Sequence, residues 1–186
     1  MARIFGWLFL VLASLSARAQ TNWPTTRLDE QATVQMPYEG TLEEDKEFRG
    51  AQLFKTTTSD NDFAVLRVDL RYIPDYNPDA VLTEAGLSKL YDKLARQYNR
   101  TVFKGKLVSR GNILLAGRPA RATRYRGFDE HYQLPIHIET IWVWQGDALY
   151  QFICSYSLPE EAGAQTDKRR FFSSVRFGPE DTGKKL

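Results

Sequence analysis

The stretch "ETIWVWQGDALYQFICSYS", residues Glu139–Ser157, decides the fold, because two runs of β-branched and aromatic residues flank the dipeptide Gly146-Asp147. Two such runs, separated by two residues of which the first is Gly, predict a β-hairpin with a two-residue turn. In that register Gln145 faces Ala148, and Glu139 faces Cys154. The hairpin therefore predicts which side chains share each face of the sheet, because directly opposed residues lie on the same face.

Both faces of this hairpin carry apolar side chains. On the first face, the predicted pairs join Val143 with Tyr150 and Ile141 with Phe152. The second face carries six apolar residues: Ile136, Ile138, Trp142, Trp144, Leu149 and Ile153. A hairpin with one face in water would alternate apolar and polar residues. We therefore expect both strands to lie in the middle of a sheet that is covered on both sides.

Two helices are predicted to provide the cover. In residues 77–100, Asn77 suits the N-cap and Pro78 suits the first helical position. Five residues of this segment recur at helical spacing: Leu87, Leu90, Tyr91, Leu94 and Tyr98. A shorter helix is expected from Pro159 to Ser173, with acidic residues early and basic residues late, as the helix dipole favours.

The remaining segments predict strands and a single domain. The strands are expected at residues 32–37, 50–58, 63–73, 105–117, 120–128 and 174–177. Three strands, a long helix, four strands, a short helix and a last strand indicate an α+β fold with an antiparallel sheet rather than a doubly wound parallel one. We expect the domain to cover residues 29–178, with an N-terminal tail at 20–28 and a C-terminal tail at 179–186.

Four segments resemble the PsbP-like family. They are "ATVQMPYEG" at residues 32–40, "LLAGRPARATRY" at 114–125, "DALYQFICSYS" at 147–157 and "FFSSVRF" at 171–177. This family includes photosystem II accessory subunits, a Ran-binding nuclear import factor and exported bacterial proteins. The resemblance implies an α/β/α sandwich with a central antiparallel sheet, and mostly binding or assembly roles. It carries over no catalytic residues, and no segment matches the Ran-binding or photosystem-binding surfaces.

Residues 1–19 have the pattern of a secretory signal peptide. Arg3 is followed by an apolar run from Ile4 to Leu15, and Ala17 and Ala19 form an A-x-A cleavage site. This run is shorter than the roughly 20 apolar residues that span a bilayer. The single cysteine is far from the cleavage site, so we expect no lipid anchor. The sequence therefore predicts an exported protein, in the periplasm or outside the cell.

The charge balance limits the class of partner. Cleavage after Ala19 removes two basic residues and leaves 23 Lys and Arg against 23 Asp and Glu, so the formal net charge falls from +2 to zero. A balanced surface argues against broad electrostatic attraction to nucleic acid or anionic membranes. We expect the partner to be a protein or a small anionic ligand.

Catalytic and metal-binding patterns are weak in this sequence. Cys154 would need a nearby histidine and a lowered pKa to act as a nucleophile, whereas its apolar flanks predict burial. His131 and His137 are the only imidazoles, and no second cysteine or acidic cluster accompanies them as in zinc sites. We expect neither a metal nor a cofactor. A small exported hydrolase that uses His137 or His131 with a hydroxyl group or Cys154 is the alternative function.

The segment "GRPARATRYRGF", residues 117–128, carries the candidate ligand-binding residues. Arg124 and Arg126 share one strand face, and beside Tyr125 they would grip a carboxylate or phosphate, which guanidinium groups bind bidentately. The other interpretation is an outer strand whose arginines pair with helix acids. We expect a non-catalytic binding or assembly module, and the sequence leaves its ligand open.

The A-x-A site predicts that the native protein begins at Gln20. Intact-mass measurement of protein purified from its own host should give the mass of residues 20–186, or that mass less ammonia if the new N-terminal glutamine has cyclised. A cytoplasmic protein that keeps Met1 would contradict the prediction of export.

Overall fold

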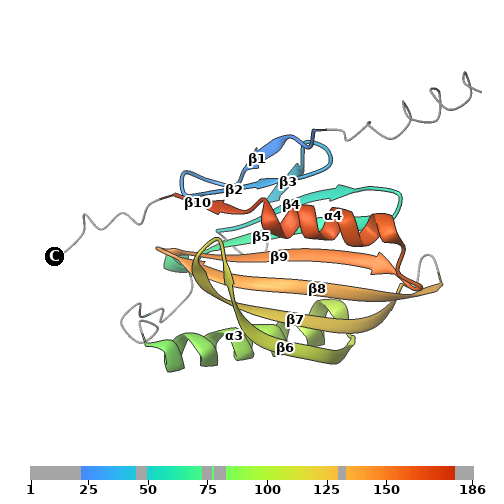
Figure 1. Ribbon diagram of the computed structural model, residues 1–186. Coiled ribbons are helices and arrows are strands. Elements are labelled where there is room, and N and C mark those ends of the chain that lie inside the picture. The colour runs from blue at the N-terminus through green and yellow to red at the C-terminus, as the bar shows by residue number, and fades with distance from the viewer. Residues whose placement is uncertain (1–21, 45–49, 73–76, 78–82, 130–132, 179–186) are drawn as a thin grey trace, which may run out of the picture.

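The computed structural model describes residues 22–44, 50–72, 77, 83–129 and 133–178, and its centre is a seven-stranded sheet (Figure 1). Its strands follow the order β3-β4-β5-β9-β8-β7-β6, and every neighbouring pair is antiparallel. The bounds are Thr41–Glu44 for β3, Ala51–Thr57 for β4, Asn61–Asp69 for β5, Lys106–Leu115 for β6, Arg118–Asp129 for β7, Leu134–Gln145 for β8 and Ala148–Ser157 for β9. Strands β3 and β6 are therefore the two edges.

The central hairpin β8–β9 has the predicted register. Gln145 pairs with Ala148, Glu139 pairs with Cys154, and the pairs between them are those expected. Gly146 begins the turn with a φ of 56°, a conformation that glycine adopts without strain. Trp142 is only 2% exposed, so the aromatic crowding in this stretch forms the core of the sheet and not a ligand pocket.

Two layers cover the sheet, one on each face (Figure 1). On one face lie helix α3 (Glu84–Tyr98), the π-helical turn η3 (Asn99–Phe103) and the short 3-10 helix η2 (Leu70–Tyr72). On the other face lie helix α4 (Ala162–Ser173) and a separate three-stranded antiparallel sheet of β1 (Thr25–Arg27), β2 (Ala32–Gln35) and β10 (Arg176–Phe177). The predicted α+β fold with a covered antiparallel sheet is confirmed, and one of its two covering layers is itself part sheet.

Apolar side chains join each layer to the sheet. On the α3 face, Tyr91 packs with Trp142 and Leu149, and the ring of Tyr98 lies edge-on to Trp142 at a centroid distance of 5.9 Å. On the α4 face, Phe171 is fully buried, with its ring centroid 5.0 Å from that of Phe63. The helical spacing of the apolar residues in α3 therefore produced the buried stripe that the sequence predicted.

Helix α3 also completes the backbone hydrogen bonding between β7 and β8. Pro119 has no N–H, and the pairing of the two strands ends at the next residue, Ala120. The Tyr91 hydroxyl donates to the Pro119 carbonyl at 3.3 Å and accepts the Trp144 backbone N–H at 2.8 Å. Burial raises the pKa of Tyr91 to about 12, so the hydroxyl stays protonated and can make both bonds.

Both helices begin later than predicted. Helix α3 begins at Glu84, where the Thr83 hydroxyl accepts the Gly86 N–H at 3.0 Å, while Asn77 is exposed and outside the helix. Residues 78–82 lie outside the described part of the chain. Helix α4 begins at Ala162 rather than Pro159. Before α3, both Asn77 and Thr83 are residue types that can cap a helix, and the structure uses Thr83. Glu161 at the start of α4 makes no side-chain cap.

The strand predictions missed β1 and β3, and they placed two strands in the wrong sheet. Both missed strands have three or four residues, too few for alternation to show. Residues 22–28 are not a tail, since β1 pairs with β2 and Trp23 is only 6% exposed. Strands β2 and β10 pair with each other rather than with the central sheet. The predicted signal peptide, C-terminal tail and His131 lie outside the described residues.

Asp29, in the loop between β1 and β2, fastens the small sheet to the central one. Its Oδ1 atom accepts the backbone N–H groups of Gln31 at 2.8 Å and Ala32 at 2.9 Å. Its Oδ2 atom accepts Tyr150 Oη and Arg67 Nε, both at 2.5 Å. Desolvation raises the pKa of Asp29, but the hydrogen bonds from Tyr150 and Arg67 outweigh it and hold the pKa below its usual range.

The variant Asp29→Asn removes this charge and keeps the shape of the side chain. We expect the free energy of unfolding near neutral pH to fall by about 2 to 4 kcal/mol, because Arg67 is left partly buried without its anion. A lowered pKa stabilises the fold above the unfolded value of about 4, and this stabilisation disappears as the pH falls through the folded value. Urea unfolding should therefore show the two proteins converging in strong acid, and an undiminished difference there would contradict the assignment.

Candidate functional site

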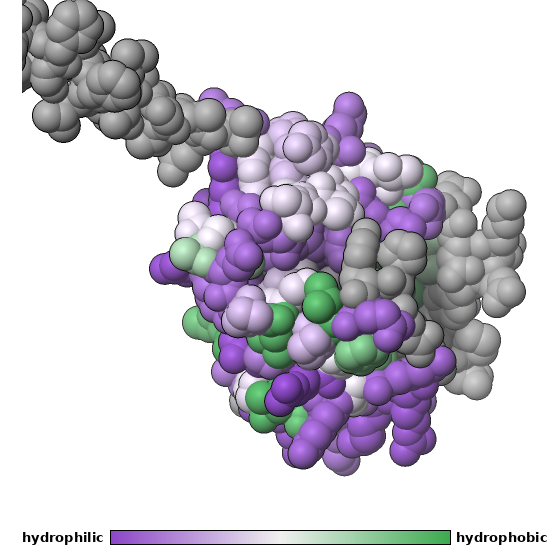
Figure 2. All heavy atoms as spheres, turned by 90° about the vertical axis from the view of Figure 1, so that its right-hand side faces the viewer, coloured by the Kyte–Doolittle hydropathy of each residue, from purple (hydrophilic) through white to green (hydrophobic). Residues whose placement is uncertain are grey.

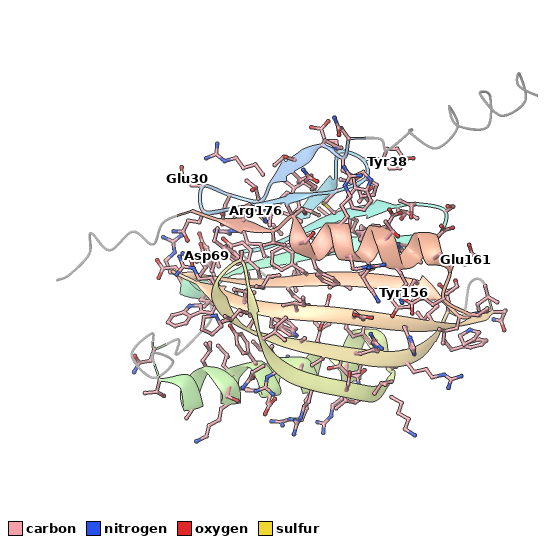
Figure 3. The ribbon with its side chains drawn as sticks, in the orientation of Figure 1. Glu30, Tyr38, Asp69, Tyr156, Glu161 and Arg176 are labelled. Carbon is pink, nitrogen blue, oxygen red and sulfur yellow. The ribbon has the colours of Figure 1, made fainter. Side chains whose placement is uncertain are left out.

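A cluster of charged side chains joins α4 to the central sheet around Glu139. The Glu139 Oε1 atom accepts the Tyr156 hydroxyl at 2.6 Å and Lys168 Nζ at 2.8 Å, and it lies 2.8 Å from Arg124 Nη2. Lys168 Nζ also donates to Glu160 at 3.0 Å. Figure 3 shows Tyr156 on the sheet alongside α4. Two bases face two acids, so the cluster is balanced in charge.

Burial and hydrogen bonding set the protonation states in this cluster. Desolvation raises the pKa of Glu139, but the hydrogen bonds from Lys168 and Tyr156 outweigh it and the pKa is lowered. Burial, followed by the hydrogen bond to Glu139, raises the pKa of Tyr156. Lys168 is only 6% exposed. These side chains satisfy one another, and the arrangement holds α4 on the sheet.

Cys154 and His137, the named residues of the hydrolase hypothesis that the structure describes, share this sheet face. Cys154 pairs across the strands with Glu139, and His137 pairs with Tyr156. Cys154 is completely buried, and desolvation, together with the charge of Glu139, raises the pKa of its thiol. Desolvation lowers the pKa of His137, whose ring lies edge-on to Tyr156 at a centroid distance of 5.7 Å. The thiol of Cys154 is therefore buried in the core, and the imidazole of His137 is neutral. A nucleophilic cysteine must instead be accessible to its substrate and have a lowered pKa.

The predicted ligand residues Arg124, Arg126 and Tyr125 lie on two different faces. Arg124 and Arg126 are on the α4 face, and Arg124 pairs with Glu139 of the neighbouring strand rather than with a helix acid. Tyr125 is 3% exposed on the α3 face, where its hydroxyl donates to the Ala95 carbonyl at 3.2 Å. Tyr125 therefore does not lie beside the arginines. The anion site at Arg124 and Arg126 stays a prediction.

Positive charge is concentrated in one part of the chain. Residues 84–129, which form α3, η3, β6 and β7, contain 11 Lys and Arg against three Asp and Glu, a net charge of +8. The rest of the predicted mature chain contains 12 Lys and Arg against 20 Asp and Glu, a net charge of −8. Strands β6 and β7 lie at one edge of the sheet beside α3 (Figure 1), so these charges gather toward that edge. The bases of α3 and Arg110 lie on the α3 side, whereas Arg124 and Arg126 lie on the α4 face.

Helix α3 and the turn that follows it present a basic stripe away from the sheet. Four exposed bases recur every three or four residues, opposite the buried stripe: Lys89, Lys93, Arg96 and Arg100. Exposed Lys104 and Arg110 continue this stripe toward β6, and Arg110 lies 3.6 Å from Asp92 of α3. Sequence reasoning missed this feature because it considered the charge of the whole chain. A count over successive segments would have found it.

Two exposed leucines of β6 lie on the same side of the sheet. Leu107 is 45% exposed and Leu114 is 72% exposed, and their partners on β7 are Tyr125 and Pro119. Tyr125 packs under α3, so both leucines belong to the face that α3 covers. These two leucines, together with Lys89, Lys93, Arg96, Arg100, Lys104 and Arg110, form what we call the basic surface.

Two hollows beside the central sheet lie away from the basic surface and carry acids. One of about 540 Å³, beside β3, β4 and β5, is lined among others by Glu39, Glu43 and Asp62, with Lys55 paired to Glu43 at 2.8 Å. The other, of about 210 Å³, is lined among others by Asp60, Asp62 and Asp129. Figure 2 shows hydrophilic side chains dominating this end of the molecule, with apolar ones in small separate groups.

Over the described ranges, no three His, Cys, Asp or Glu side chains are grouped to hold a metal ion. Among the same residues, no helix is long and apolar enough to cross a membrane.

Comparison with solved structures identifies the fold. The chain is similar to cyanobacterial PsbP from Synechocystis sp. PCC 6803, with 12% identity over 87% of this chain and 96% of that one, and a TM-score of 0.56. A protein of unknown function from Pseudomonas aeruginosa has 15% identity over 85% of this chain and 99% of that one, with a TM-score of 0.48. LpqN of Mycobacterium tuberculosis, which is involved in cell envelope biogenesis, has 10% identity over 86% and 80%, with a TM-score of 0.42. No family model and no curated protein matches the sequence. The chain has a PsbP-like fold, as the resemblance implied.

The burial of Cys154 predicts how its thiol reacts. A maleimide probe should label the protein only after denaturation, because the thiol is inaccessible and its pKa is raised. Cys154→Ala should leave the fold intact and lower the free energy of unfolding by about 1 kcal/mol for a small cavity. Rapid labelling of the folded protein would restore the nucleophile hypothesis.

Proposed function

We propose that this protein is an exported, non-catalytic binding module that recognises an anionic partner through the basic surface. The observation that carries the proposal is the group of six exposed bases on the α3 side of the fold, within residues 84–129, whose net charge is +8. Like charges held close together repel one another and destabilise the compact state. A partner of opposite charge relieves that repulsion. Binding such a partner therefore explains why so many bases lie close together.

The pairing pattern of the charged residues supports this proposal. Around Glu139, bases and acids are already joined in ion pairs that hold α4. In the basic surface, Arg110 lies near Asp92, while Lys89, Lys93 and Arg96 are exposed on the outer side of α3. An incoming anion can therefore reach these side chains without disturbing the core.

Export rests on the signal-peptide pattern of residues 1–19 and the predicted start at Gln20. An exported protein meets the anionic macromolecules of the cell envelope or of the extracellular medium. The proposed setting is therefore the periplasm or the cell exterior, where the basic surface selects partners by charge.

The double variant Lys89→Glu/Lys93→Glu tests the binding role with fluorescent polyglutamate as a model polyanion. Each ion pair in water contributes about 1 kcal/mol at contact, so losing two should weaken binding in about 0.1 M salt by at least about 30-fold, and the introduced acids add repulsion. The matched control is Lys55→Glu/Arg169→Glu, which changes the charge equally at exposed positions outside the basic surface. At this salt concentration the Debye length is about 10 Å, so fluorescence anisotropy should show the control, whose changes lie on β4 and α4, within about twofold of wild type. Equal weakening of both variants, or no binding by wild type at low salt, would refute the proposal.

A further inference from the structure

We infer that the anionic partner is a lipid bilayer surface, on which the protein lies with its basic surface against acidic headgroups. This inference rests on the proposed function and names the partner of the same site. It is carried by the shape of the basic surface, by its exposed leucines and by the irregular edge of β6.

The shape of the basic surface fits an extended planar partner. The stripe from Lys89 to Arg100 covers about 16 Å along the helix axis at 1.5 Å per residue. Lys104 and Arg110 widen it toward β6, and all six bases are exposed. Neither of the two acid-lined hollows includes a residue of this surface. Charges spread along an exposed stripe suit a layer of headgroups better than one small anion.

The two leucines add a contact that a purely ionic partner would not use. Leu114 is 72% exposed and Leu107 45% exposed, on the same side of the sheet as the stripe. In water, these side chains keep apolar area in contact with solvent. At a bilayer surface, they can enter the boundary between headgroups and acyl chains while neighbouring bases meet phosphates. Bases beside exposed apolar residues are the composition of interfacial membrane-binding surfaces.

The edge strand β6 is poorly suited to a partner that would add another strand. The pairing of β6 with β7 shifts register between Leu107 and Ser109, which marks a β-bulge. Lys106 and Arg110 place charges along the same edge. Bulges and edge charges are features by which sheets avoid edge-to-edge pairing. The observations therefore favour a bilayer over an acidic extended peptide.

Zero net charge does not prevent this binding. The acid-rich edge at β3 lies six strand spacings from β6, roughly 29 Å at about 4.8 Å each. Electrostatic interactions in physiological salt decay over about 8 Å. The bilayer therefore responds to the basic surface nearest to it. The sequence expectation that a balanced charge argues against anionic membranes assumed mixed charges, and the fold separates them.

Co-sedimentation with vesicles tests the inference on the mature full-length protein. We expect binding to phosphatidylcholine vesicles that contain phosphatidylglycerol, loss of binding at high salt, and no binding to pure phosphatidylcholine. Each basic residue near an anionic bilayer strengthens binding about fivefold, so Lys89→Gln/Lys93→Gln should weaken it about 30-fold. The control Lys55→Gln/Arg169→Gln should stay within about twofold, and Leu114→Ser should weaken binding and leave the fold intact, as circular dichroism would show.

The outcomes separate the inference from the proposed function. If wild type binds polyglutamate but not phosphatidylglycerol vesicles, the partner is an acidic protein, and the lipid inference is overturned while the binding proposal stands. If it binds neither, both are overturned. Equal binding to neutral vesicles, or equal weakening of the control variant, also overturns the lipid inference, because binding would then not depend on the basic surface.

Discussion

Burial of both faces of the β8–β9 hairpin requires two covering layers, and the rest of the fold is arranged to provide them. Trp142 and Leu149 need α3 on one face, while Phe152 and Cys154 need α4 and the small sheet on the other. An antiparallel sheet with one face in water could not hold this sequence without exposing a large apolar surface. The position of the hairpin in the middle of the sheet follows from the same constraint.

Polar side chains then fix where each layer sits. Tyr91 bonds α3 to the gap that Pro119 leaves in the sheet, and Asp29 bonds the small sheet to Arg67 and Tyr150. Lys168 bonds α4 to Glu139. Apolar packing alone allows one layer to slide over another. A partly buried hydrogen bond is costly to leave unmade, so it favours the one placement of the layers in which it forms. The three contacts define the relative placement of the layers.

The same architecture separates charge. Because β6 and β7 end the sheet beside α3, consecutive basic segments of the chain meet on one side, while the acids of Glu39, Glu43 and Asp62 surround a hollow near the other edge. The distance between the two edges exceeds the screening length in physiological salt. A chain whose predicted mature form has no net charge can therefore present a strongly basic surface, and the proposed binding role depends on that separation.

The sequence by itself determined the hairpin register, the two apolar faces, the burial of Cys154 and the existence of both helices. These features depend on residues close together in the chain, where alternation and helical spacing directly reflect the geometry. Only the tertiary structure decided that β2 and β10 form a separate sheet, that Thr83 caps α3, that Glu139 neutralises Arg124, and that Arg110 of β6 lies on the same side as the bases of α3. Each of these depends on which distant segments pack together, and no local pattern records that choice.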